Sequence, residues 1–190
     1  SVLYHLALSG WTDCLLVEKS ELTSGSTWHA AGNCPSFSGS WTVMNMQRYS
    51  TDLFTKLGER VDYPMNYHNT GSIRLAHNKN RLDEFKHVYA MQKHLNVGME
   101  MMTPAEMQEK VPFCEMHDVI GGIWDPTDGD IDPAQLSQAY AKGARDLGAK
   151  ISRFNRVTDL VQRADKSWDV VTEKGTVHAE IIVNAAGYMA

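Results

Sequence analysis

Residues 15–19 read Leu15-Leu16-Val17-Glu18-Lys19, a short apolar run that ends in an acid and a base. Apolar residues recur at helical spacing over residues 2–9, and Gly10 is placed to end that helix. A helix, a tight turn and a buried strand that ends in an acid are the second and third parts of a βαβ dinucleotide-binding unit. In such a unit the acid, here Glu18, binds ribose hydroxyls, although a solvated acid at a strand end fits this pattern equally well. The first strand and its G-x-G-x-x-G turn are expected upstream of Ser1.

The next segment is small and polar and contains two glycines, one indole and one imidazole: Ser24-Gly25-Ser26-Thr27-Trp28-His29-Ala30-Ala31-Gly32. Glycine allows backbone conformations that other residues resist, and the peptide N–H groups that open a helix can face an anion. These properties are typical of a loop that lies against a flat, phosphate-bearing ligand. A neutral imidazole is also a competent nucleophile. Taken without other information, His29 is more simply interpreted as a buried histidine that is hydrogen-bonded near Trp28.

Composition places the chain among ordinary globular proteins. It has 190 residues, of which 43% are hydrophobic and 22% are charged, and these fractions are average. The net charge of -5 gives no support to nucleic-acid binding or to a membrane-surface role. No apolar run approaches the ~20 residues that span a bilayer.

Neither the cysteines nor the clustered acids predict a metal site. The cysteines lack metal-ligand spacing and are interpreted as reduced thiols in a reducing compartment. They are Cys14, Cys34 and Cys114. Residues 125–133 are rich in aspartate, but the spacing and final glutamate of a calcium-binding EF-hand loop are missing. We expect a glycine turn there, followed by a helix with Asp132 as its N-cap and Pro133 at its first position.

The rest of the chain mixes helices with isolated strands. Helices are expected over residues 41–57, with Gly58 as the stop, and over 82–89, 104–111 and 133–147. Strands are expected over residues 72–76, 99–102, 119–124, 157–161, 167–172 and 176–183. This order predicts an α/β (α+β) fold in which a nucleotide-binding domain is interrupted by a second, mixed domain. The predicted parts are residues 1–66 and 131–190 for the first domain and residues 67–130 for a substrate-side domain.

Five blocks of sequence carry a family resemblance. They are residues 16–23 (LVEKSELT), 25–32 (GSTWHAAG), 71–76 (GSIRLA), 128–133 (DGDIDP) and 182–187 (IVNAAG). With them, essentially the whole chain resembles the flavin-dependent amine dehydrogenases of the dimethylglycine and sarcosine dehydrogenase group, within the glycine/D-amino-acid oxidase-like superfamily. The block with the histidine is specific, whereas the last block is shared by many flavoproteins. The resemblance implies a Rossmann-like FAD-binding domain, truncated at both ends, with an inserted mixed domain.

The resemblance also implies a role for single residues. It places Glu18 and Lys19 at the ribose, and it gives His29 a covalent bond to the 8α carbon of FAD. It places nine consecutive residues around the pyrophosphate and the flavin ring: Gly25, Ser26, Thr27, Trp28, His29, Ala30, Ala31, Gly32 and Asn33. Val157 matches a position whose backbone meets the adenine, and residues 184–187, with Ala186 and Gly187, match a return strand beside the cofactor. The glycine fingerprint and the folate-binding C-terminal domain of the group are missing from the chain.

The activity implied is oxidation of N-methylated glycine, either dimethylglycine or sarcosine, by hydride transfer to covalently bound FAD. Electrons would pass to an electron-transfer flavoprotein, and tetrahydrofolate would act only in the full-length protein. We assign no catalytic base, because Tyr67, His68 and His117 are of types that more often have surface or packing roles. The fragment alone is expected to hold FAD poorly. The location implied is the cytoplasm for a bacterial protein and the mitochondrial matrix for a eukaryotic one.

Three alternatives stay open. The first is an oxidase of the same fold that transfers electrons to oxygen. The second is a non-catalytic regulatory homologue, such as the regulatory subunit of pyruvate dehydrogenase phosphatase, although the Trp28-His29 block argues against it. A plain nicotinamide dehydrogenase is the weakest, because the 190 residues do not divide into a compact six-stranded doubly wound sheet.

Overall fold

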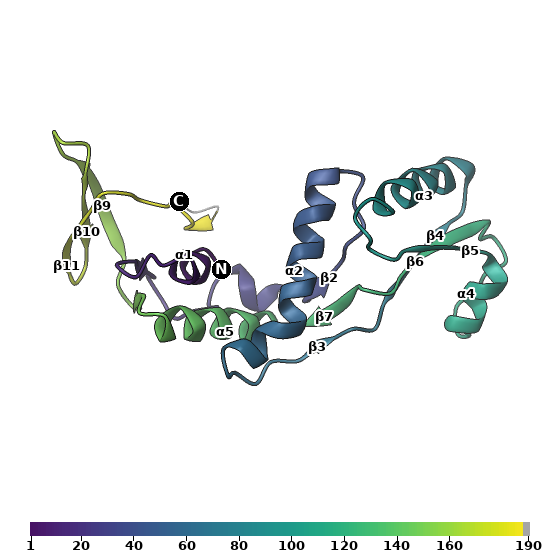
Figure 1. The fold of residues 1–190 in the computed structure, drawn as a ribbon, viewed down its shortest axis with the longest axis horizontal. Helices are drawn as coiled ribbons and strands as arrows, with labels where there is room; N and C mark the ends of the chain where they lie inside the picture. The colour runs from purple at the N-terminus through teal and green to yellow at the C-terminus, as the bar shows by residue number, and fades with distance from the viewer. Residues whose placement is uncertain (188–190) are drawn as a thin grey trace. The chain divides into compact units, whose positions relative to one another are not determined.

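The computed structural model describes residues 1–187 and shows a mixed α/β chain in two compact units. One unit combines Ser1–His29 with Tyr140–Ala190, and the other is Ala30–Ala139. Helix α5 (Pro133–Asp146) contains one of the two boundaries (Figure 1). The mixed α/β class predicted from the sequence is confirmed. The predicted division at residues 66/67 and 130/131, with an inserted substrate-side domain, stays a prediction.

The first unit is built on two copies of one local pattern, a helix that ends at a glycine and leads into a strand. Helix α1 (Val2–Leu8) leads to β1 (Leu15–Val17), and α5 leads to β8 (Lys150–Ser152). Both glycines have positive φ, +91° at Gly10 and +96° at Gly148. In each case the glycine N–H and the next N–H donate to carbonyls of the last helical turn, which is a Schellman ending. Strands β1 and β8 then pair in parallel. The βαβ prediction concerns another partner of β1, a strand expected upstream of Ser1, and stays a prediction.

The same unit contains a three-stranded antiparallel meander. Its strands are β9 (Val157–Gln162), β10 (Trp168–Thr172) and β11 (Gly175–Ala179). The hairpin between the first two was predicted, but the strand predicted over residues 176–183 is wrong beyond Ala179. A strand needs a hydrogen-bonded neighbour, and residues 180–186 have none within the described part of the chain. Their apolar side chains are therefore exposed, 65% at Ile181 and 58% at Val183.

The second unit contains two small antiparallel sheets. One is β4-β6-β5, formed by β4 (Ser72–Ala76), β6 (Gly121–Asp125) and β5 (Glu100–Met102). The other is β2-β7-β3, formed by β2 (Asn33–Cys34), β7 (Gly129–Ile131) and β3 (Tyr67–His68). Helix α3 (Lys79–Gln92) packs on the first sheet, so Phe85 and Val88 share a core with Ile123.

Helix starts in this unit follow the expected capping chemistry. Helix α4 (Pro104–Lys110) begins with a complete capping box between Thr103 and Glu106. The carboxylate of Asp132 accepts from the first N–H groups of α5. Helix α2 (Trp41–Arg60), however, continues beyond Gly58, so the predicted stop there is wrong. A Cβ on Gly58 would lie 3.0 Å from the carbonyl oxygen of Tyr63. The absence of a side chain at Gly58 therefore allows the backbone that follows α2 to pack closely against the helix.

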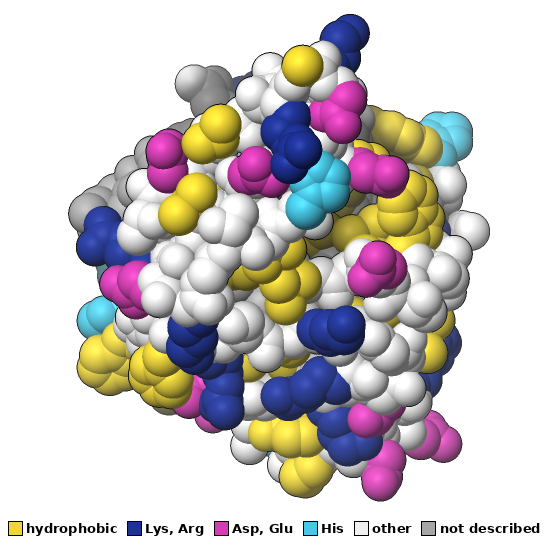
Figure 2. Space-filling model, turned by 90° about the vertical axis from the view of Figure 1, so that its left-hand side faces the viewer, with side chains coloured by type: hydrophobic (Ala, Val, Ile, Leu, Met, Phe, Trp, Pro, Cys, Tyr) yellow, Lys and Arg dark blue, Asp and Glu magenta, His cyan; other side chains and the backbone are white. Residues whose placement is uncertain are grey.

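The surface carries charged side chains of both signs, as the modest net negative charge leads one to expect. On the face drawn in Figure 2, Lys and Arg side chains are interspersed with Asp, Glu and hydrophobic side chains. Ion pairs of the chain include Arg153 with Glu21 at 2.6 Å and Arg163 with Asp169 at 3.2 Å. Within residues 1–187, no helix combines the length and the apolar character needed to cross a bilayer.

Candidate cofactor and substrate sites

The loop that holds the candidate nucleophile is accessible. Residues Ser26–His29 form a short 3₁₀-helix, η1, in the first unit. The ring centroids of Trp28 and His29 lie 4.4 Å apart with the planes tilted by 42°. Trp28 is 64% exposed, and His29 is exposed as well. The interpretation of His29 as a buried histidine is therefore wrong, and its imidazole can reach a ligand.

Glu18 lies where the βαβ pattern predicted it, at the end of β1. Its N–H donates to the carbonyl of Ser152, so the parallel ladder extends one residue beyond Val17. Carboxylate oxygen Oε1 accepts from the N–H of Ser20 at 2.8 Å. Within residues 1–187, Oε2 makes no hydrogen bond. This half-buried carboxylate keeps an acceptor for a hydroxyl, which fits a ribose. The neighbouring Lys19 is exposed.

The two glycines of the loop have different roles. Gly32 has φ of +84°, and a Cβ there would lie 2.0 Å from the carbonyl oxygen of Ile131. The Ile131 N–H donates to the Gly32 carbonyl, which joins the end of the loop to β7. Gly25 has an ordinary φ and nothing within 4 Å of a Cβ. The expectation of a special backbone conformation therefore holds for Gly32 and is wrong for Gly25.

The other predicted cofactor residues lie in exposed positions. Val157 opens β9 opposite Thr172, where the register shifts, and it is 38% exposed. The N–H of Ala186 donates to the Asn184 side chain, and Gly187 has φ of +80°. Ala30, Ala31 and Asn33 are exposed in the second unit. Nothing in these positions tests contact with a cofactor, so their roles stay predictions.

Sequence reasoning missed a buried acid pair in the second unit. Asp128 accepts from the Ser36 N–H, the Ser72 hydroxyl and the Arg74 guanidinium. Asp125 is 1% exposed, and its Oδ1 accepts from the N–H and hydroxyl of Thr127. Its Oδ2 is buried without a partner among the described residues. Burial and the neighbouring Asp128 raise the pKa of Asp125 to about 6. Only the clustering of acids could have indicated this pair.

The structure bears on the metal-binding and acid–base candidates of the sequence one by one. Among residues 1–187, no group of three or more His, Cys, Asp or Glu side chains could hold a metal ion. Nδ1 of His117 lies 3.7 Å from Oε2 of Glu115, and both side chains are strongly exposed. The hydroxyl of Tyr67 donates to the Thr127 carbonyl at 2.8 Å, and burial raises its pKa. Tyr67 is therefore a structural residue.

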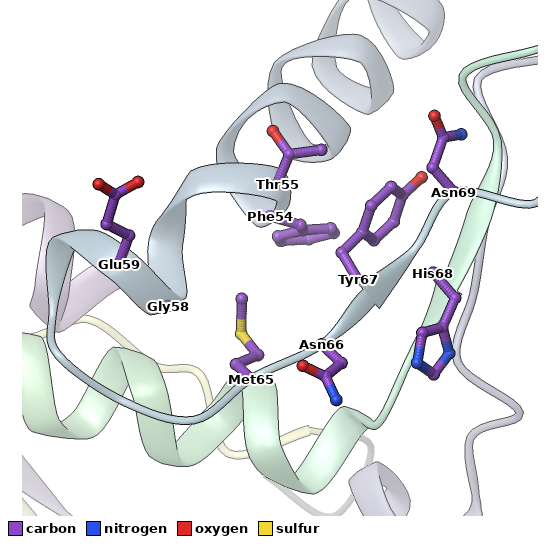
Figure 3. A pocket seen from close by; sticks show the side chains of 9 residues that line it. All are labelled: Phe54, Thr55, Gly58, Glu59, Met65, Asn66, Tyr67, His68 and Asn69. Carbon is purple, nitrogen blue, oxygen red and sulfur yellow. The ribbon is translucent and has the colours of Figure 1, made fainter.

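His68 has a more distinctive setting. Its Nδ1 lies 3.0 Å from Oδ1 of Asp130, which faces it across the sheet. Figure 3 shows that Tyr67 points toward Phe54 while the His68 ring leaves β3 on the other side. Tyr67, Phe54 and Met65 line a hollow of about 400 Å³ between α2 and β3. A second hollow of about 300 Å³ is lined by Asn33, Arg74, Asp130 and their neighbours.

Comparisons with known proteins agree with the resemblance found in the sequence. The family model described as FAD dependent oxidoreductase matches residues 1–190. Human mitochondrial dimethylglycine dehydrogenase is 42% identical over 190 residues, which are all of this chain and 22% of that protein. The mouse mitochondrial pyruvate dehydrogenase phosphatase regulatory subunit is 30% identical over 190 residues, again all of this chain and 22% of that protein. The chain thus spans about a fifth of the length of these relatives.

A solved structure extends the agreement to the fold. L-Proline dehydrogenase from P. horikoshii superposes with a TM-score of 0.88 at 27% identity. The match covers 97% of this chain and 48% of that one. The comparison of sequences and the comparison of structures therefore each include a dehydrogenase among the similar proteins.

Proposed function

The chain belongs to the family of FAD-dependent oxidoreductases, and on this premise we propose that it forms part of an amine dehydrogenase that oxidises N-methylated glycine. The substrate would be dimethylglycine or sarcosine. The 42% identity to human dimethylglycine dehydrogenase along the whole chain supports this substrate class. Electrons would pass to an electron-transfer flavoprotein, and tetrahydrofolate would take part only in a longer protein. A eukaryotic protein of this kind would reside in the mitochondrial matrix.

The observation that carries the proposal is the exposed imidazole of His29 beside the exposed indole of Trp28. A nucleophilic side chain can bond to a cofactor only if a ring nitrogen is accessible. Both residues belong to η1, which follows the acid-terminated strand β1. We propose that His29 binds FAD covalently, and that the indole lies against the same ring system.

The other residues would hold the cofactor by ordinary polar contacts. Oε2 of Glu18 would accept from a ribose hydroxyl, with Lys19 beside it. The hydroxyls of Ser26 and Thr27 would donate to phosphate oxygens, and the backbone at Val157 would contact the adenine. Bound FAD would supply a two-electron acceptor for a hydride from the carbon next to the amine nitrogen.

Replacing His29 with alanine tests the covalent bond. Purified holoprotein is run on a denaturing gel, and flavin fluorescence is read on the protein band. We expect fluorescence from the wild type and its complete loss from His29→Ala, because no other side chain of the loop offers an imidazole nitrogen. His178→Ala is the matched control, since His178 is another exposed histidine of the first unit. Fluorescence that survives in His29→Ala would contradict the assignment.

The 30% identity to a phosphatase regulatory subunit favours one second candidate, a non-catalytic homologue. Anaerobic addition of dimethylglycine or sarcosine to the holoprotein separates the two. Bleaching of the flavin absorbance supports the dehydrogenase, and no bleaching with either amine supports the regulatory role. Rapid reoxidation of the bleached flavin by air would instead support an oxygen-using oxidase.

A further inference from the structure

Three polar side chains form a row across the sheet β2-β7-β3. Asp130 of β7 is paired with Asn33 of β2 on one side and with His68 of β3 on the other. Residues paired across antiparallel strands project from the same face of a sheet. The neighbouring Ile131 projects from the opposite face and is 4% exposed. The row therefore lies on the face away from the buried side.

Asp130 fixes the state of the His68 ring. A carboxylate can only accept, so the 3.0 Å contact assigns the proton of the neutral ring to Nδ1. Nε2 then carries the lone pair, and within residues 1–187 it makes no hydrogen bond. An imidazole that is oriented by a carboxylate and has Nε2 free is the arrangement of a general base.

The row is connected to the candidate flavin loop by the chain itself. Asn33 is the last residue of that loop and follows His29 by four positions in the sequence. Asn33 and Asp130 line the hollow of about 300 Å³, whereas His68 lines the hollow of about 400 Å³, and each is large enough for a small amino acid.

A second histidine–aspartate pair, on the surface, provides a comparison for His68 and Asp130. Nδ1 of His77 lies 3.2 Å from Oδ2 of Asp118, with similar exposure of both side chains. His77 follows the end of β4, belongs to no strand pair and lines neither hollow. The two pairs thus share their local chemistry and differ in their surroundings.

We infer that His68 is the base that accepts a proton from the substrate's ammonium group, and that Asp130 is its positioning residue. The inference rests on the proposed function. In this step an ammonium N–H bond breaks, its electron pair stays on nitrogen, and the proton bonds to Nε2. The resulting imidazolium remains hydrogen-bonded to Asp130, and nothing is oxidised or reduced. The freed lone pair is what permits the adjacent carbon to lose hydride.

The need for a base follows from the substrate. An alkylammonium group ionises near pH ~10, so at neutral pH the amine carries its proton. Histidine changes charge between about pH 5 and 8 and is suited to remove it. The charged group in contact with His68 is Asp130 of the row, and Glu59 of α2 lines the same hollow as His68.

His68→Gln, Asp130→Asn and the control His77→Gln test the inference in the holoprotein. The rate of flavin bleaching by dimethylglycine is measured from about pH 6 to about pH 10, together with covalent flavin content. We expect full flavin content in all three variants. His68→Gln should lose about 10²–10³-fold in kcat/KM near neutral pH and recover toward the wild-type value as the amine loses its own proton. Asp130→Asn should lose less, and His77→Gln should match the wild type.

The outcomes separate this inference from the proposed function. A pH profile of His68→Gln that coincides with those of the wild type and His77→Gln would overturn the role of His68 and leave the proposed function intact. Asp130→Glu should recover part of the activity lost in Asp130→Asn, and equal losses in both would overturn the positioning role. A wild-type flavin that neither amine bleaches would overturn the proposed function, and the inference with it.

Discussion

Replacing Gly32 with alanine is expected to destabilise the unit formed by residues 30–139 by at least about 3 kcal/mol. The new Cβ would lie 2.0 Å from the carbonyl oxygen of Ile131, and φ at this residue is +84°. The obstacle is backbone, which cannot rotate away as a side chain can. Relief would require breaking the hydrogen bond from the Ile131 N–H to the Gly32 carbonyl. Urea unfolding of the holoprotein measures the loss, and hydrogen exchange of the β7 amides locates it.

Gly25→Ala is the matched control in the same loop. Its Cβ would meet nothing within 4 Å and its φ is ordinary, so we expect a change within about 0.5 kcal/mol. A flavin content that falls in Gly25→Ala without a loss of stability would indicate that the cofactor approaches this residue closely. Equal stability of Gly32→Ala and Gly25→Ala would contradict the described path of the loop.

Replacing Asp125 with asparagine is expected to stabilise the fold at neutral and alkaline pH. The pKa of this buried carboxyl is raised from 3.8 to about 6. A carboxyl with a higher pKa in the folded chain binds its proton more tightly there, so its contribution to stability falls as pH rises from about 4 to about 6. The difference between the two pKa values corresponds to about 3 kcal/mol. Asparagine stays neutral, and its Oδ1 can keep both contacts with Thr127.

The stability advantage of Asp125→Asn should therefore be about 3 kcal/mol near pH 8 and about half of that near pH 5. Urea unfolding at the two pH values measures both. The acids with lowered pKa act in the opposite direction, and their contribution to stability is lost only as pH falls below their ordinary range. They are Glu21, Asp83, Glu106, Asp165 and Asp169. Asp118→Asn, at an exposed aspartate, is the control. A pH-independent difference for Asp125→Asn would contradict the buried pair.

Features with local causes were predictable from the sequence. The Schellman endings at Gly10 and Gly148 and the capping box of Thr103 and Glu106 depend on residues a few positions apart. Two predicted element ends were wrong, one of a strand and one of a helix, and both depend on residues distant in the sequence. The strand predicted to Val183 lacks a neighbour within the described chain, and α2 passes Gly58 because the chain returns against it.

The candidate site shows the same limit. Glu18 could be placed because the acid directly follows its own strand. The pairing of His68 with Asp130 joins residues 62 positions apart, and Ser36 reaches Asp128 across 92. Sequence spacing alone gives no information on such pairings. The burial of Asp125 depends on the packing of several elements, so its raised pKa could not be predicted from the sequence either.

The most direct test of the account is mass spectrometry of a proteolytic digest of the holoprotein. The central claim is that a flavin is bonded to the imidazole of His29. The account predicts that the peptide with Trp28 and His29 carries the mass of one flavin, and that fragmentation places this mass on His29. An unmodified peptide from flavin-loaded protein, or a flavin mass on another residue, would contradict the claim.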